Sequence, residues 1–398
     1  MKKISIILLL LMLILCPLIV NATEEAIETE DPDLIEKSYI VTDTVAKVIE
    51  TKEVREVVTG SMKDQVQQVT IEIIDGEYIG EEFTTDFVLS YDIEGKILAY
   101  ELEVGDKVLV QLAEEEDGTI SATVQDVVRS NYIVLMFGFF LLSVVIIGGK
   151  QGIKAVIGLL LTITLIYFIL VKRVFAGGNA IVLTISTAIL IIGGTFIVIG
   201  GFNKKILTAA IGTLGGIITA GLVALVFNHL AKMSGACEDA IQLSINMSSI
   251  SFNFRDLLFV GIIISALGAC MDVGMSIASS LDELKMKKSD ITGKELFVSG
   301  MNIGRDVIGT MTNTLILAYV GSSLTLILLF MACNMGITEI LNKETIAEEV
   351  IAAIAGSIGV VYTVPITSFV YSVLNKDRLI YNKTSENKIN GKRSLKIN

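Results

Sequence analysis

One charged side chain of this sequence lies deep within an apolar stretch, and it is a carboxylate. Asp272 belongs to the segment ALGACMDVGMSIASSLDEL, in which its neighbours are apolar or small. At helical spacing, Ser265 and Ser276 share the face of Asp272. A charge inside a bilayer costs at least ~2.5 kcal/mol on insertion scales, so such a residue is a candidate for handling ions or protons.

The next apolar stretch, GMNIGRDVIGTMTNTLILAY, has a matching polar face at helical spacing. If the cytoplasmic ends of the two helices lie near Ala278 and Val307, Asp272 and Asn313 are both ~9 Å deep, at ~1.5 Å per residue. They are then able to meet directly or through water, with a charged pair at the mouth of the seam. We therefore predict a proton- or ion-handling site formed by Asp272, Ser276, Asn302, Arg305, Asp306 and Asn313.

The sequence leaves the role of Asp272 open. Burial and a nearby Arg305 act on its pKa in opposite directions, so the carboxyl either exchanges protons, as a relay requires, or is held in a fixed ion pair or cation site. The structural alternative is that Asp272 bonds Asn313 and nearby serines and joins two helices.

Residues for other kinds of chemistry are scarce. The chain has a single histidine, His229, and its four cysteines are far apart in sequence. The sequence therefore lacks the histidines that Ser-His-Asp or Cys-His catalysis and histidine-ligated metal sites require. No phosphate-binding GxxxxGK[ST] motif occurs. The sequence predicts a protein that is not an enzyme and that has no cofactor or metal.

The elements that position these residues are apolar helices. Slightly over half of the residues are hydrophobic, and runs of about 20 apolar residues cross a ~30 Å hydrocarbon core. The sequence predicts a polytopic α-helical membrane protein, with a transmembrane bundle of about seven helices over residues 131–374. The runs are Asn131 to Ile147, Ile153 to Val171, Asn179 to Ile199, Ile206 to Phe227, Leu257 to Ser280, Val307 to Met331 and Glu349 to Leu374.

Small residues recur every four positions within these runs. The pairs are Gly212 with Gly216, Ala352 with Gly356, and Ala355 with Gly359. Such spacing lets helices approach closely, and we expect packing within the chain. Pro365 lies inside the last run and should kink it, with Thr363 and Thr367 available for the freed backbone groups.

A different kind of sequence precedes the helices. Residues 1–22 carry two lysines, a leucine-rich core and a small-residue ending, which predicts a signal peptide or a first transmembrane helix. Residues 23–130, between Ala22 and Asn131, hold about 28 acidic and 8 basic residues. Their short alternating stretches predict a small β-rich barrel or sandwich. The clearest stretches are Gln68 to Ile74, Phe83 to Ser90, Val108 to Leu112 and Thr119 to Val128.

Basic residues predict the orientation in the membrane. The expected inside segments are residues 148–152 and 200–205, a long loop from Leu281 to Asp306, and the basic tail 375–398. They carry roughly 15 Lys and Arg, against about 5 in the outer loops, which follows the positive-inside rule. We expect a multi-pass protein of the bacterial cell membrane, with an extracytoplasmic β-rich domain and a cytoplasmic C-terminus. The acidic domain should repel nucleic acid and is able to bind a protein partner outside.

Three stretches carry a resemblance to a known family. They are GGFNKKILTAAIGTLGG (Gly200 to Gly216), ALGACMDVGMSIASSLDEL (Ala266 to Leu284) and GMNIGRDVIGTMTNTLILAY (Gly300 to Tyr319). The chain resembles the YibE/F family of bacterial multi-spanning membrane proteins from Arg129 to about Leu374. The resemblance implies an architecture rather than an activity.

Two functions therefore stand as hypotheses. The first is a membrane transporter or export factor coupled to a proton or ion gradient through Asp272. The second is a non-transporting scaffold or sensor that binds a partner through its extracytoplasmic domain. The sequence names neither a substrate nor an oligomeric state.

Overall fold

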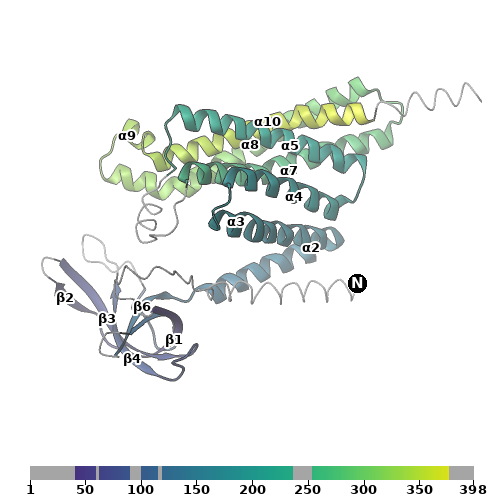
Figure 1. Ribbon diagram of the computed structural model, residues 1–398. Coiled ribbons are helices and arrows are strands. Elements are labelled where there is room, and N and C mark those ends of the chain that lie inside the picture. Colours follow the sequence, from purple (N-terminus) through teal and green to yellow (C-terminus); the bar gives the residue numbers. More distant parts are fainter. Residues whose placement is uncertain (1–40, 60–61, 90–99, 115–118, 236–252, 376–398) are drawn as a thin grey trace, which may run out of the picture. The chain divides into compact units, whose positions relative to one another are not determined.

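The computed structural model describes residues 41–59, 62–89, 100–114, 119–235 and 253–375 (Figure 1). The chain forms two compact units that divide between Ser143 and Val144. Each unit is described by itself below. The predicted export segment 1–22 and almost all of the predicted tail 375–398 lie outside the described residues.

The first unit contains one antiparallel sheet in the order β2-β3-β1-β5-β6, with β4 paired to β3. Strands β4 and β6 also come into contact, so the sheet curls toward a half-closed barrel. The predicted β-rich domain is confirmed, and each of the four predicted stretches overlaps a strand. The strands are β1 (Val41–Thr51), β2 (Arg55–Thr59), β3 (Met62–Ile73), β4 (Glu82–Leu89), β5 (Lys107–Glu114) and β6 (Ile120–Val127).

Alternation of apolar and polar residues explains this sheet. In β5, Val108, Val110 and Leu112 are buried while Lys107 and Leu109 are exposed, because successive side chains of a strand point to opposite faces. The buried side chains form one apolar core between the two curled halves of the sheet. Alternation was the signal that predicted the strands, and the core is its consequence.

A buried amide ties a loop to this core. The side chain of Gln67 is 3% exposed and bonds both backbone groups of Leu102. Its Nε2 donates to the Leu102 carbonyl at 2.9 Å, and its Oε1 accepts from the Leu102 N–H at 2.8 Å. A buried amide needs such partners, since an unpaired polar group in a core costs ~1–3 kcal/mol. Gln67 therefore fixes the segment that leads into β5.

Among the described residues, six stretches of helix are long and apolar enough to cross a membrane. They cover the seven predicted apolar runs to within one residue, because the first stretch, Ser130–Phe175, holds two runs. The polytopic helical prediction is confirmed. The helices are α2 (Ser130–Leu165), η2 (Ile166–Val171), α3 (Lys172–Phe175), α4 (Ala180–Gly200), α5 (Lys204–Leu230), α7 (Phe254–Lys287), α8 (Gly293–Ala332), α9 (Ile337–Leu341) and α10 (Glu344–Leu374).

The first stretch is broken at a glycine. Gly149 has φ 54° and ψ −129°, which is not helical. A Cβ built on Gly152 would lie 2.1 Å from the carbonyl oxygen of Val144, eight residues away, whereas a continuous helix would separate them by ~12 Å. The chain therefore reverses at Gly149, which is the short break that the two runs predicted.

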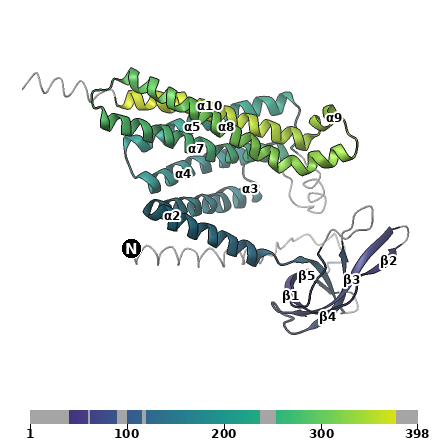
Figure 2. The same ribbon diagram turned by 180° about the vertical axis from the view of Figure 1, so that it is seen from behind.

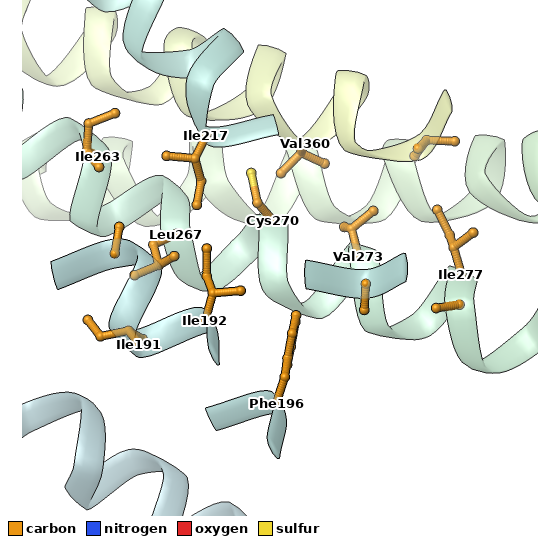
Figure 3. Close-up of a cluster of buried hydrophobic side chains, with 14 of the residues drawn as sticks. Ile191, Ile192, Phe196, Ile217, Ile263, Leu267, Cys270, Val273, Ile277 and Val360 are labelled. Atoms are coloured by element: carbon orange, nitrogen blue, oxygen red, sulfur yellow. The ribbon is translucent and has the colours of Figure 1, made fainter. Parts of the chain in front are cut away.

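The second unit is built around α5, α7 and α10, with α4 and α8 packed against them. Figure 3 shows the centre of this bundle. Side chains of α7 such as Leu267 and Val273 lie between Phe196 of α4 and Val360 of α10. Asparagine side chains cap two of these helices: Asn179 accepts from the Val182 N–H at the start of α4, and Asn203 accepts from the Ile206 N–H at the start of α5.

Small residues bring α5 and α10 together. A Cβ on Gly212 would lie 1.8 Å from Thr367 Oγ1, and one on Gly216 would lie 2.7 Å from the Gly359 carbonyl oxygen. The two backbones are therefore close enough that only glycine fits. The prediction that the small-residue repeats pack within the chain is confirmed.

The connection between α7 and α8 differs from the prediction. A long inside loop from Leu281 to Asp306 was expected, but only residues 288–292 lie between the helices. The prediction was wrong because apolar runs mark the part of a helix within lipid, while charged residues such as Lys285 continue a helix well in water. A capping box, in which Thr292 and Glu295 bond each other's backbone N–H groups, starts α8.

Candidate functional site

Asp272 lies near the middle of α7, on the side of that helix turned away from the bundle. Ile263, Cys270 and Ile277 lie on the buried side. Asp272 and Ser276 are both exposed on the opposite side. The polar face that the sequence predicts for this helix is thus real, and it forms part of the surface of the bundle.

The polar face of α8 also points outward. Asn302, Arg305, Asp306 and Asn313 are exposed, whereas Gly300 and Gly304 pack toward α10. Helix α8 is buried at few positions along its length and crosses the front of the bundle in Figure 2. We call the exposed side of this helix pair the outer polar face, and it comprises Asp272, Ser276, Asn302, Arg305, Asp306 and Asn313.

Two contacts fix the alignment of α7 with α8. The first lies far from the connecting loop 288–292, where the Tyr319 hydroxyl donates to Ser265 Oγ. The second lies closer to that loop, where a Cβ on Gly300 would be 3.1 Å from Leu281 Cδ1. The two helices therefore run antiparallel as a hairpin.

Interpolation between these contacts gives the height of Asp272 on the hairpin. It lies level with Met311 of α8, so Asn313 is ~3 Å farther along the axis at ~1.5 Å per residue. Among the described residues, no hydrogen bond joins Asp272 to Asn313, and Asp272 has neither a hydrogen-bond partner nor an ion-pair partner. Similar height alone does not bring the two side chains together, because each points outward from its own helix.

Arg305 has a partner on its own helix. Its Nη1 donates to Asn302 Oδ1 at 3.0 Å. Within the described part of the chain, neither Asp272 nor Asp306 forms an ion pair with it. Of the six predicted residues, the structure therefore joins only Asn302 and Arg305 by a hydrogen bond.

The hydrogen bond that joins α7 to α8 uses a residue that the sequence reasoning missed. Tyr319 ends the same motif as Asn313 and bonds Ser265, a member of the face of Asp272. The available signal was the tyrosine itself, because a hydroxyl within an apolar run needs a hydrogen-bond partner.

A second polar group was also missed, and it is buried in the bundle. Thr363, Thr367 and Ser368 of α10 are fully buried. Thr363 Oγ1 donates to the Gly359 carbonyl at 2.8 Å, while no partner is found for Thr367 Oγ1 or Ser368 Oγ in the part of the chain that is described. The carbonyl that Pro365 leaves without its helical donor is that of Val361, four residues earlier. Neither threonine bonds it among the described residues, so the expected help around Pro365 is not seen. These hydroxyls lie where the small residues of α5 and α8 crowd α10.

At the other end of α10, a carboxylate holds a loop. Glu344 Oε1 accepts from the backbone N–H of Gly235 at 2.8 Å, and Oε2 accepts from Ser234 Oγ at 2.9 Å. This clamp joins the start of α10 to the chain beyond α5. It has the character of a structural connection, since all its bonds go to the protein itself.

The fold and the surface residues define a class: a membrane protein made of apolar helices, preceded by a β-rich domain, with a polar face on one helical hairpin.

Two family models match this chain. The model described as YibE/F-like protein matches residues 136–377, and the model described as YibE/F family N-terminal domain matches residues 38–127. The chain belongs to the YibE/F family. Comparisons with curated proteins and with solved structures gave no match.

Proposed function

We propose that this protein is a membrane transporter or export factor, rather than an enzyme, and that it is driven by a proton or ion gradient. Asp272 is the residue that takes up and releases the ion. The β-rich unit lies outside the cytoplasm and the C-terminus inside, because the Lys and Arg residues between the helices concentrate on one side.

The observation that carries the proposal is an unpaired carboxylate in the middle of an apolar helix. Asp272 is 18 residues from the start of α7 and 15 from its end, which is ~22 Å or more from either end. Its lack of a partner among the described residues leaves it free to exchange an ion. Intramembrane carboxylates of this kind occur in proton relays and ion pathways.

The structural alternative has less support. If Asp272 joined α7 to α8, it would bond Asn313 or a serine across the hairpin. That connection is made by Tyr319 and Ser265 instead. Asp272 is thus a costly residue with no structural contact among the described residues, which favours a role in transport.

Chemical labelling tests the proposal without a known substrate. The purified protein, in lipid vesicles, is treated with a hydrophobic carbodiimide at a series of pH values, and the adduct is located by mass spectrometry. Such reagents modify protonated carboxyls within a membrane. We expect labelling of Asp272 that falls as pH is raised, and no adduct at this position in Asp272→Asn. Asp256→Asn, in the first turn of the same helix, is the control and should leave the labelling unchanged.

Absence of labelling at every pH, in folded protein, would overturn the proposal. The scaffold or sensor hypothesis then makes a separate prediction. Deletion of the β-rich domain, residues 41–127, would abolish any cellular phenotype of the gene, while Asp272→Asn would leave it intact. A transporter gives the opposite result for Asp272→Asn.

A further inference from the structure

We propose that the outer polar face of α7 and α8 is the interface between two copies of this chain. The inference goes beyond the proposed function and does not depend on it. It starts from an imbalance, because a bilayer-facing surface should be apolar, yet within the apolar runs this face holds the carboxyl of Asp272 and the amide of Asn313. Lipid tails offer no hydrogen bonds, so these two groups need a polar cover.

Asp272 and Asn313, the members of the face that lie within the apolar runs, make this need acute. Measured from Ala278 and Val307, both are ~9 Å inside the membrane. An aspartate within the hydrocarbon core is costly, up to ~2.5–3.5 kcal/mol at its centre on insertion scales. Neither side chain has a hydrogen-bond partner among the described residues. The described part of the chain therefore leaves both groups without a polar partner.

Glycines on the same hairpin give independent support. A Cβ built on Gly268 or Gly309 would meet no atom within 4 Å, whereas Gly300 and Gly304 of α8 are crowded by α10. Glycine inside a helix costs roughly 0.5–1 kcal/mol relative to alanine. Packing within the chain explains the crowded glycines but not Gly268 and Gly309. Other helix glycines, such as Gly193 of α4, are open in the same way, so the two are distinguished by their place on the face of Asp272 and Asn313. A helix of another molecule that approaches closely gives them a reason.

The chemistry of the face fits a second copy of itself. Two copies in the same orientation are related by an axis along the membrane normal, so each residue meets residues of its own depth. Arg305 is then level with Asp306 of the second copy, and Asp272 is ~3 Å in height from Asn313 of the second copy. The first pair is an ion pair and the second is a hydrogen bond from an amide to a carboxylate. Both pairs form twice.

The apolar segment 1–22, outside the described residues, is another candidate occupant. It has no charged side chain after Lys3 and no amide before Asn21. Its single hydroxyl, that of Ser5, is too little for both Asp272 and Asn313, whereas a second copy supplies a partner for each.

Single-molecule counting tests the interface. Fluorescently labelled protein is diluted in lipid vesicles, and photobleaching steps give the monomer and dimer fractions. We expect a dimer whose dissociation constant rises about tenfold or more in Gly309→Leu, which removes the close approach. Gly193→Leu is the control, since a Cβ on Gly193 of α4 also meets nothing within 4 Å. A monomeric wild type overturns the proposal, and so does a dimer that Gly309→Leu leaves unchanged.

A charge exchange guards against a misfolded variant. Arg305→Asp places like charges across the interface and should weaken the dimer by about tenfold or more. Adding Asp306→Arg to the same chain restores opposite charges and should restore the dimer. If the double variant is as weak as the single one, the ion pair is refuted. Because the readout is the number of photobleaching steps rather than carbodiimide labelling, failure of the dimer and failure of ion coupling at Asp272 are distinguished.

Discussion

Replacement of Gly216 by alanine tests the packing on which the bundle depends. A Cβ at this position would lie 1.9 Å from Thr363 Oγ1 and 2.7 Å from the Gly359 carbonyl oxygen. The hydroxyl is able to rotate only by giving up its 2.8 Å bond to that same carbonyl. The carbonyl belongs to the backbone and has no rotamer. Helices α5 and α10 must therefore move apart.

The expected loss of stability follows from these contacts. An extra methyl in a close-packed core costs ~1–3 kcal/mol, and alanine returns roughly 0.5–1 kcal/mol by its better helix propensity. Because the clash involves the Gly359 backbone, the cost lies in the upper part of this range, ~2–3 kcal/mol, and the net change for Gly216→Ala is a loss of ~1–2.5 kcal/mol. At ~2–4 °C per kcal/mol for a unit of this size, the melting temperature should fall by roughly 2–10 °C.

The assay is thermal unfolding of the purified full chain in detergent. The folded fraction that remains after heating is measured by size-exclusion chromatography with fluorescence detection. Gly193→Ala is the matched control, because its Cβ would meet nothing within 4 Å, and it should match or exceed the wild type. Adding Thr363→Ala to Gly216→Ala removes the nearer of the two clashing atoms. The stability lost through Gly216→Ala should therefore be smaller in the Thr363→Ala background. A melting temperature of Gly216→Ala at or above that of wild type would refute the close approach of α5 and α10.

Two further predictions concern the β-rich unit. Gln67→Leu leaves the backbone groups of Leu102 unpaired in the core, so amide hydrogen exchange at Leu102 should accelerate, with a stability loss of ~1–3 kcal/mol. The second concerns pH: bonds from Arg129 and from the backbone N–H of Val127 hold the pKa of Asp126 below its ordinary value. The stabilisation is present above the ordinary pKa and is lost as pH falls through the lowered one. Arg129→Gln should raise the Asp126 pKa, as measured by carboxyl-carbon NMR titration of the full chain.

Each of these predictions has a result that would contradict it. Gln125→Leu removes an amide that is exposed in β6, and it should leave exchange at Leu102 unchanged. Equal exchange in Gln67→Leu and Gln125→Leu would show that the buried amide does not hold the loop. An unchanged titration of Asp126 in Arg129→Gln would show that the ion pair does not form in solution.

The sequence by itself was sufficient for the architecture, because the signals for it are local. Apolar runs of membrane length give the helices without knowledge of their neighbours. Alternation in segments such as Lys107–Glu114 gives strands for the same reason. The break at Gly149 was predicted as a short interruption between two runs. Helix ends beyond the lipid were missed, since the continuation of α7 to Lys287 depends on propensity and capping rather than on hydropathy.

The sequence also selected Asp272, because a carboxylate in an apolar run is visible without a structure. Its surroundings were decided only by the tertiary structure. Helical spacing shows which residues share a face, but it does not show what that face contacts. The rotation of α7 and α8 is fixed by packing against α5 and α10, where Gly274 of α7 and Gly304 of α8 must lie inside. That packing turns Asp272 and Asn313 outward, which is why the direct contact that the sequence left possible is absent among the described residues.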